Sequence, residues 1–261
     1  MSEVIIVDDE AEASKIVSDL LVKSIIKNPE LVLGLATGST PLGVYKLVAE
    51  SIKEKHVDVS GVRGFALDEY VGLSKMHQES YHFVINSNVT EPIGLTPENV
   101  HVPDGDESTI EQAGAEYEKL IKASGGVDIQ ILGIGTDGHI GFNEPGSSLS
   151  SRTRIKTLTE QTRLDNARFF NDVDEVPRHC ITQGIGTILE AKHLVLMAFK
   201  STKSKAVADA LEGPISAFCP ASALQLHPHT TVFIDHAAAA LLKNTDYYKW
   251  VYKNKPDWQG W

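Results

Sequence analysis

The amino-acid sequence predicts an α/β protein: one domain built on a doubly wound, mostly parallel, Rossmann-like sheet with helices on both faces. Short, almost wholly apolar runs, such as residues 31–36 and 193–199, are typical of strands buried on both faces. They alternate along the chain with segments of helical periodicity, the order that produces parallel sheets. The 261 residues, 42% of them hydrophobic, suit one large domain, and no change in composition marks a boundary within residues 1–261.

The first elements follow this alternation. Residues 4–7 are an apolar run and predict the first strand. Asp9 and Glu12 have the spacing of a capping pair, which predicts a helix over residues 10–27. The second strand, residues 31–36, is followed by a different kind of segment.

That segment, Thr37-Gly38-Ser39-Thr40-Pro41, has the features of an anion site. It joins a strand to the helical periodicity of residues 44–52, and Pro41 suits the first position of a helix. Backbone N–H groups, the hydroxyls of Ser39 and Thr40 and the positive end of the helix dipole would converge on one point. An ordinary helix cap explains the same residues equally well.

A third strand, residues 64–67, ends in Asp68-Glu69-Tyr70. We expect this segment at the same edge of the sheet as the anion-site turn. Two adjacent carboxylates at a strand end form either a solvated turn or a catalytic acid–base group, and by themselves they favour the turn. The next predicted elements are a helix over residues 79–89, a short strand over 99–102 and a helix over 111–122.

The most informative stretch follows a buried strand at residues 127–132. Gly133 and Gly135 break the strand and allow the backbone to approach a ligand closely. Three titratable residues come directly afterwards: Asp137, His139 and Glu144. An imidazole between two carboxylates can be held in one tautomer and can move protons near neutral pH. The sequence therefore favours an active site here over a glycine-rich surface loop.

The remaining chain continues the pattern. Residues 152–158 alternate like a strand and carry three cations. Residues 162–177 are polar and form either a mobile lid over the site or a plain surface loop. Lys203 lies in the first turn of a helix that ends at Gly213, where a cation is unfavourable unless an anion shares the place. The other predicted elements are a helix over 184–191, strands over 193–199 and 230–235, and an aromatic, basic tail over 247–261 that packs on the body or on a neighbouring subunit.

Composition restricts the class of protein. The formal charge of −11 argues against binding to nucleic acid or to anionic membranes. The N-terminus does not have the pattern of a signal peptide, and no apolar stretch approaches the ~20 residues that span a bilayer. The two cysteines, Cys180 and Cys219, are interpreted as reduced thiols of a cytoplasmic protein.

Several of these stretches together resemble the glucosamine-6-phosphate deaminases from about residue 31 to residue 235. The matching segments are Leu35-Ala-Thr-Gly-Ser-Thr-Pro41, Leu67-Asp-Glu-Tyr-Val-Gly-Leu73, Gly133-Ile-Gly-Thr-Asp-Gly-His-Ile-Gly-Phe-Asn-Glu-Pro145, Ser151-Arg-Thr-Arg-Ile-Lys-Thr-Leu158, Ala167-Arg-Phe-Phe170 and Leu224-Gln-Leu-His227. The resemblance implies conversion of glucosamine 6-phosphate to fructose 6-phosphate and ammonia, with no metal and no organic cofactor.

The resemblance also implies roles for residues. His139, held by Asp137 and Glu144, would open the sugar ring, and Asp68 would move the C2 proton to C1. Glu144 would also assist departure of the amine. The substrate phosphate would be bound by the following residues: Gly38, Ser39, Thr40, Arg168 and Lys203.

A regulatory site is the last implication. Arg154 and Lys156 are two residues apart, so they point to one face of a strand and can bind one anion together. With Ser147 and Ser148 they match the residues by which hexameric deaminases bind the activator N-acetylglucosamine 6-phosphate, whereas other members are smaller assemblies. Solvated cations or ion pairs are the alternative, and the residues around Met1, which contribute in those hexamers, match poorly.

Two other functions are compatible with parts of the pattern. A 6-phosphogluconolactonase would have a similar phosphate loop and Asp-Gly-His turn, but an Arg is expected where this chain has Tyr70. A sugar-phosphate-sensing regulator would need a DNA-binding segment, for which the chain has no room, and would not need both Asp68 and His139.

Overall fold

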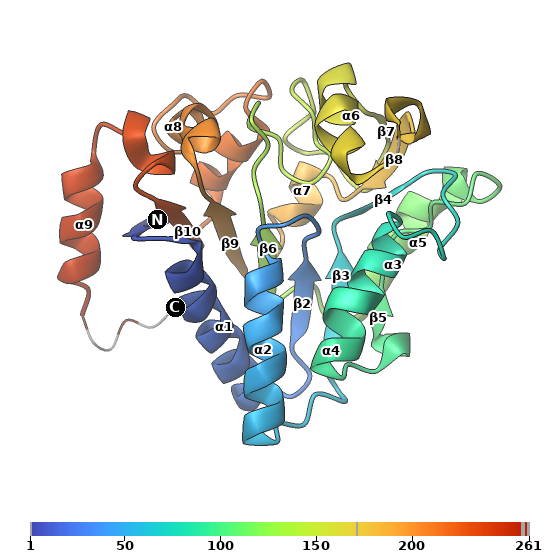
Figure 1. The fold of residues 1–261 in the computed structure, drawn as a ribbon, viewed down its shortest axis with the longest axis horizontal. Coiled ribbons are helices and arrows are strands. Elements are labelled where there is room, and N and C mark those ends of the chain that lie inside the picture. The colour runs from blue at the N-terminus through green and yellow to red at the C-terminus, as the bar shows by residue number, and fades with distance from the viewer. Residues whose placement is uncertain (1, 171, 257–258, 260–261) are drawn as a thin grey trace.

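The computed structural model describes residues 2–170, 172–256 and 259. Its centre is a seven-stranded sheet in which every pair of neighbouring strands is parallel, in the order β1-β10-β9-β6-β2-β3-β5 (Figure 1). These strands are β1 Ser2–Val7, β2 Val32–Leu35, β3 Arg63–Ala66, β5 Val100–His101, β6 Ile129–Leu132, β9 His193–Ala198 and β10 Thr230–Asp235. The central strands β2, β6 and β9 are buried along their whole length, and the predicted doubly wound fold is confirmed.

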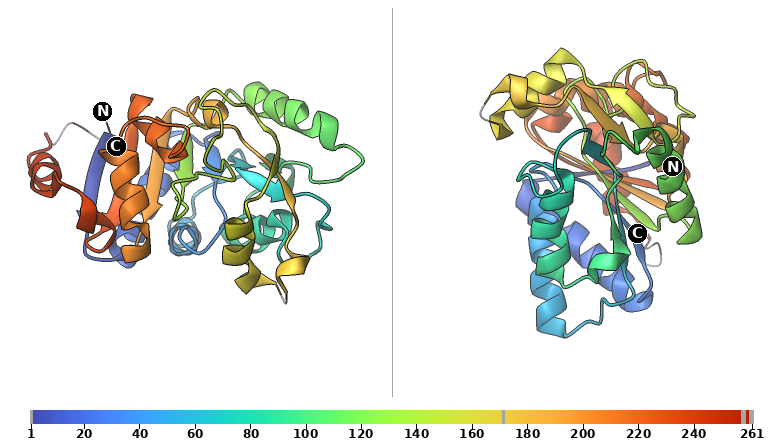
Figure 2. Two further views of the ribbon diagram at one scale, coloured as in Figure 1. Left: turned by 90° about the horizontal axis from the view of Figure 1, so that it is seen from above. Right: turned by 90° about the vertical axis from the view of Figure 1, so that its right-hand side faces the viewer.

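Helices cover both faces of this sheet. α1 and α2 pack together on one face, and α5 lies on the opposite side (Figure 2). The helices are α1 Glu10–Lys27, α2 Leu42–Lys55, α3 Tyr81–Ile85, α4 Glu91–Ile93, α5 Ile110–Ala123, α6 Glu160–Asn166, α7 Ile185–Ile188, α8 Ser204–Leu211 and α9 Thr245–Lys253. The predicted cap of α1 is present, because the Glu12 N–H donates to Asp9 Oδ1 at 2.8 Å. None of the helices among the described residues combines the length and the apolar character needed to cross a bilayer.

A second, antiparallel sheet corrects one expectation. Asp68-Glu69-Tyr70 does not lie at the edge of the main sheet; it forms β4, Asp68–Tyr70, in a three-stranded sheet with β8, His179–Thr182, and β7, Arg154–Thr157. The backbone N–H of Leu67 still bonds to the main sheet, and Asp68 then pairs with Thr182 of β8. This small sheet has its own apolar cluster, which consists of Tyr70, Phe142, Leu158, Val176 and Cys180.

The order of the strands defines where a ligand binds. After β2 the chain continues to β3 and β5 on one side, whereas after β6 it continues to β9 and β10 on the other. β2 and β6 are parallel neighbours, and the order in which strands are added to the sheet switches from one side to the other between them. Ligands of doubly wound sheets bind at such a point. The loops that follow β2 and β6 are the predicted anion-site turn and the His139 turn.

Two predicted helices differ from the structure, and two other segments contain helices that the sequence did not specify. The predicted helix over 79–89 is α3, a π-helical turn at Asn86–Thr90 and α4, and it continues past Pro92 because Pro92 occupies the first turn of α4. The predicted helix over 184–191 is only α7. The polar segment 162–177 contains most of α6 and two 3-10 turns. Part of the predicted tail is α9, which packs beside β1 on the body of the protein. Residues 171, 257–258 and 260–261 of these two segments lie outside the described residues.

Candidate active site

Asp137, His139 and Glu144 lie together on the turn after β6. His139 Nδ1 is 2.7 Å from Asp137 Oδ1 and 3.6 Å from Glu144 Oε2. The backbone N–H of Gly135 donates to the carbonyl of His139 at 2.9 Å. A Cβ atom at Gly135 would stand 2.3 Å from the His139 ring, so only glycine permits this close approach.

The two carboxylates differ in their surroundings. Partial burial opposes ionisation of Asp137, but the adjacent His139 outweighs it and lowers the pKa of Asp137 to about 2. Glu144 is 3% exposed, and its Oε1 accepts from the N–H and hydroxyl of Thr159, both at 3.3 Å. An ionised carboxylate therefore orients the imidazole from the solvent side, and a fixed carboxyl group approaches it from the protein interior.

Asp68 faces the same turn from β4. A Cβ at Gly141 would stand 3.3 Å from Asp68 Oδ2, so the carboxyl group lies against the backbone of the His139 turn. Burial raises the pKa of Asp68 to about 8, and the negative charge of Glu69 adds to this shift. The hydrogen bond from the Phe142 N–H opposes the shift in part. A carboxyl group with such a pKa can accept and return a proton near neutral pH.

Glu69 belongs neither to a solvated turn nor to the group of carboxylates around His139. Its buried carboxylate accepts from the backbone N–H groups of Tyr70, Tyr81 and His82 at 2.7, 2.9 and 2.8 Å. It thereby holds the start of α3 against β4 and adds a negative charge beside Asp68. Sequence analysis missed this role, because the contact joins segments 12 residues apart and no local pattern marks it.

The turn after β2 is held in a fixed shape, with Gly38 and Ser39 exposed. Gly38 has φ 88°, a backbone conformation that favours glycine. The Tyr45 hydroxyl bonds to both the N–H and the carbonyl of Ala36 at 3.0 Å and fixes the start of the turn. Pro41 occupies the cap position rather than the first turn of α2, and no side chain caps this helix, so the geometry does not favour an ordinary hydroxyl cap.

Lys203 and Arg168 are brought within electrostatic reach of one another. Burial lowers the pKa of Lys203, Arg168 lowers it further, and Asp165 and Asp137 oppose the shift. Lys203 therefore lies near both the cation of the 162–177 segment and the His139 turn. The Arg168 guanidinium carbon lies 4.6 Å from the ring centre of Phe169.

The four residues of the predicted regulatory site are only partly free. Arg154 Nη1 donates to Asn143 Oδ1 at 2.8 Å, so the guanidinium is tied to the His139 turn. Ser147 is buried and its hydroxyl donates to the carbonyl of Glu144 at 2.6 Å. Lys156 shares a half-buried face of β7 with Arg154, and the Ser148 hydroxyl lies 3.1 Å from that of Ser150.

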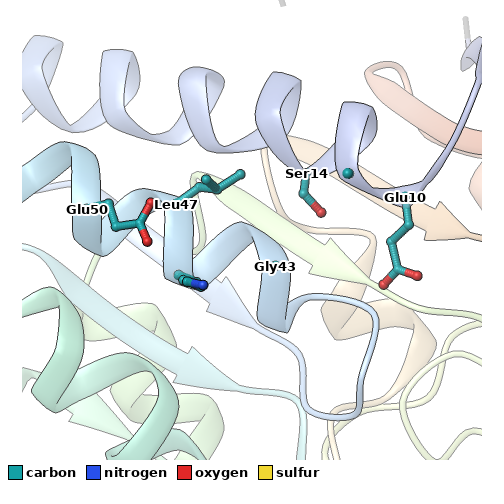
Figure 3. Close-up of a pocket in the computed structure, with 7 residues that line it drawn as sticks. Glu10, Ser14, Gly43, Leu47 and Glu50 are labelled. Atoms are coloured by element: carbon teal, nitrogen blue, oxygen red, sulfur yellow. The ribbon is translucent and has the colours of Figure 1, made fainter.

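A separate cavity lies away from these residues. It occupies about 420 Å³ between α1 and α2 and is lined by residues that include Glu10, Ser14, Gly43, Leu47 and Glu50 (Figure 3). None of the predicted site residues lines it, and we assign it no part in the active site.

Comparisons with known proteins agree with the resemblance that the sequence motifs carry. A family model described as "Glucosamine-6-phosphate isomerases/6-phosphogluconolactonase" matches residues 9–233. A Bifidobacterium longum (strain DJO10A) protein named glucosamine-6-phosphate deaminase is 57% identical and covers 100% of both chains, and a Streptomyces avermitilis protein of the same name is 56% identical over 99% of each.

Two solved structures are informative. One, described as a monomeric glucosamine-6-phosphate deaminase, has a TM-score of 0.89, is 42% identical, and matches 92% of this chain and 99% of its own. A 6-phosphogluconolactonase from Leishmania guyanensis has a TM-score of 0.72 at 20% identity, matches 93% of this chain and 99% of its own, and shows likeness of fold alone.

Proposed function

Since the chain belongs to the family of glucosamine-6-phosphate isomerases and 6-phosphogluconolactonases, we propose that it catalyses the isomerising deamination of glucosamine 6-phosphate to fructose 6-phosphate and ammonia in amino-sugar catabolism. The observation that carries the proposal is Asp68, a buried carboxyl group with a raised pKa that faces the His139 turn. The net reaction consumes one water and is formally the hydrolysis of a C–N bond. Formation of both products from glucosamine 6-phosphate is the direct test.

The His139 turn suits the opening of the sugar ring. The imidazole carries a proton between the C1 hydroxyl and the ring oxygen, and Asp137 holds the ring in the orientation that this transfer needs. Glu144, which approaches the same ring nitrogen from the interior, provides a proton for the departing amine.

Asp68 suits the isomerisation. As a base it removes the proton at C2 of the open-chain aldehyde, which gives an enolamine, and it returns this proton at C1. Water then attacks the resulting imine at C2, and ammonia leaves. Neither step requires a metal or an organic cofactor, because carboxyl and imidazole groups carry every proton.

The phosphate end orients the reacting carbons. We assign its binding to the backbone and hydroxyls of Gly38, Ser39 and Thr40 and to the cations Arg168 and Lys203. Two observations support this assignment: α2 has no side-chain cap, and Lys203 is a half-buried cation within electrostatic reach of Arg168, Asp165 and Asp137. An anion bound by both cations would offset the repulsion between Lys203 and Arg168.

Replacing either cation should weaken binding of hexose phosphates, product included. Lys203→Ala and Arg168→Ala each lose a charge-assisted contact of about 1.5–3 kcal/mol, a rise in Kd of roughly 10- to 100-fold for fructose 6-phosphate. The matched control is Lys205→Ala, because Lys205 pairs with Asp209 on the surface. An unchanged Kd would assign the cation a structural role instead.

Residues 162–177 serve in this proposal as a lid. Asn166 of α6 donates to the Tyr70 hydroxyl at 3.0 Å, a contact that joins the segment to β4 beside Asp68. The Thr162 N–H donates at 3.1 Å to the hydroxyl of Thr159, which in turn contacts Glu144. The segment thus contacts β4 directly and reaches Glu144 through Thr159.

We further propose that the protein is a cytoplasmic homo-oligomer, a hexamer if it is regulated, and that N-acetylglucosamine 6-phosphate activates it through Ser147, Ser148, Arg154 and Lys156. The hydrogen bond from Arg154 to Asn143 connects the regulatory site to the active site. An anion that binds Arg154 would weaken this bond and so change the position of the His139 turn. The alternative is an enzyme that the activator does not regulate, because one solved relative is described as monomeric.

A substrate titration with and without the effector tests the regulatory site. Activation requires tighter binding of the effector to the active state, so the effector should remove sigmoidal kinetics in the wild type but not in Lys156→Ala. Lys192→Ala, which loses only a surface pair with Asp128, is the control. Hyperbolic kinetics that the effector leaves unchanged would refute the regulation and leave the catalytic assignment intact.

Hydrolysis of 6-phosphogluconolactone is the second candidate function, because the family contains both activities and the fold is shared. Tyr70 argues against it. It lies buried among the rings of Tyr81, Phe142 and Phe170, and it offers no cation to a carboxylate product.

A further inference from the structure

We propose that Asp137, His139 and Glu144 also bind a divalent transition-metal ion, with Zn²⁺ as the test case, and that the bound ion inhibits the enzyme. The ion is an inhibitor and not a cofactor of the proposed reaction. Among the described residues, these three offer donor atoms that all lie within 4.8 Å of one another. One imidazole nitrogen and two carboxylate oxygens are ligands that Zn²⁺ accepts.

Two of the three donor atoms, His139 Nδ1 and Glu144 Oε2, are buried without a hydrogen-bond partner, whereas Asp137 Oδ1 accepts from the backbone N–H of His139 at 3.1 Å. Two carboxyl groups converge on His139 Nδ1, which carries at most one proton. Asp137 holds one side of the imidazole at 2.7 Å, and the buried Oε2 of Glu144 is left without a donor. A buried carboxylate oxygen without a donor is unfavourable, and a cation between these atoms removes that cost.

The distances suit a small ion. Zn²⁺ holds nitrogen and carboxylate oxygen at about 2.0–2.2 Å, so two ligands of a tetrahedral site stand about 3.4 Å apart. The 3.6 Å between His139 Nδ1 and Glu144 Oε2 already matches this spacing. The 2.7 Å between His139 and Asp137 must widen, and Asp137, with 36% of its side chain exposed, is the ligand that can move.

An ion at this place excludes the chemistry proposed for the site. It occupies the imidazole nitrogen that Asp137 orients and the carboxyl group assigned to the departing amine. Three protein ligands leave one position open, as in catalytic zinc sites, and the exposed Asp137 gives access from solvent. Inhibition should therefore be reversible and should compete with substrate.

The test measures binding on the resting protein and so does not depend on which reaction the site performs. Calorimetric titration with Zn²⁺ should show one ion per chain, and Co²⁺ should give the visible absorption of a four-coordinate complex. Glu144→Gln and Asp137→Asn keep the side-chain shapes and should each weaken Zn²⁺ binding at least 10-fold. In the wild type, Zn²⁺ should reduce turnover, and a chelator should restore it.

Two control variants exclude binding of Zn²⁺ by other metal-binding side chains. Cys219→Ser removes the thiol that lies against Gly138, where a Cβ would stand 2.7 Å from the sulfur. His229→Gln removes one of two histidine rings that stack at 3.7 Å at the amino ends of β9 and β10, whereas the His139 turn follows the carboxyl end of the parallel strand β6. The proposal is overturned if either control abolishes Zn²⁺ binding, if Glu144→Gln leaves the affinity unchanged, or if bound Zn²⁺ leaves turnover unaffected.

Discussion

Asp68→Asn should abolish exchange of the C2 proton with solvent while hexose phosphates still bind. The amide keeps the size of the carboxyl group but cannot accept the proton, and loss of a general base costs typically ~10²–10⁴-fold in rate. The measurement is turnover together with incorporation of solvent deuterium at C1 of fructose 6-phosphate. Near-normal activity would place the base elsewhere.

The pH dependence provides an internal control for the same residue. The base must be ionised, and the pKa of Asp68 is raised to about 8, so kcat/KM of the wild type should rise with pH towards that value. The residual kcat/KM of Asp68→Asn should not show this rise with pH. A rise that persists in the variant would belong to a different group.

Stability should respond in the opposite direction. A carboxyl group whose pKa is higher in the folded state favours folding when protonated, and this contribution is lost as pH rises from the unfolded value, about 4, to about 8. Asn cannot ionise. The free energy of unfolding should therefore fall less between pH 4 and 8 in Asp68→Asn than in the wild type, which urea titrations at several pH values would measure.

His139→Gln should act mainly on ring opening. Gln occupies a similar volume but cannot shuttle a proton between the C1 hydroxyl and the ring oxygen. We expect a loss of about 10²–10⁴-fold with glucosamine 6-phosphate and a much smaller loss with an acyclic analogue that cannot close the pyranose ring. The comparison is the ratio of kcat/KM for the two substrates.

The ratio distinguishes this role from general damage to the site. His139 is held on a turn whose backbone also lies against Asp68, so a structural disturbance would affect both substrates. Equal losses with cyclic and acyclic substrates would mean that His139 acts in another step.

The parts of the fold that sequence predicted are those with a local signal. β2 and β9 are largely apolar runs, and the run that contains β6 alternates and then ends apolar; all three strands are buried along their whole length. α1 spans Glu10–Lys27 as expected, since Asp9 and Glu12 cap it in sequence order. The place of the His139 turn, directly after β6, followed from the rule that ligands bind at the carboxyl ends of strands, whereas Asp68 lies in the antiparallel strand β4.

The parts that sequence did not predict depend on long-range contacts. β8, His179–Thr182, is a four-residue strand with no marked alternation, and it pairs with β4 more than 100 residues away. Without β8, the antiparallel sheet that carries Asp68 could not be foreseen. The capping of α3 by Glu69 and the bond from Arg154 to Asn143 likewise join separate segments. The roles assigned to the site residues remain predictions.

The two candidate functions are distinguished by incubating the protein with glucosamine 6-phosphate, and separately with 6-phosphogluconolactone, and following both reactions to their products. We expect equal amounts of ammonia and fructose 6-phosphate from the amino sugar, no hydrolysis of the lactone above its spontaneous rate, and loss of the first activity in Asp68→Asn. Turnover of the lactone alone would refute the assignment as a deaminase.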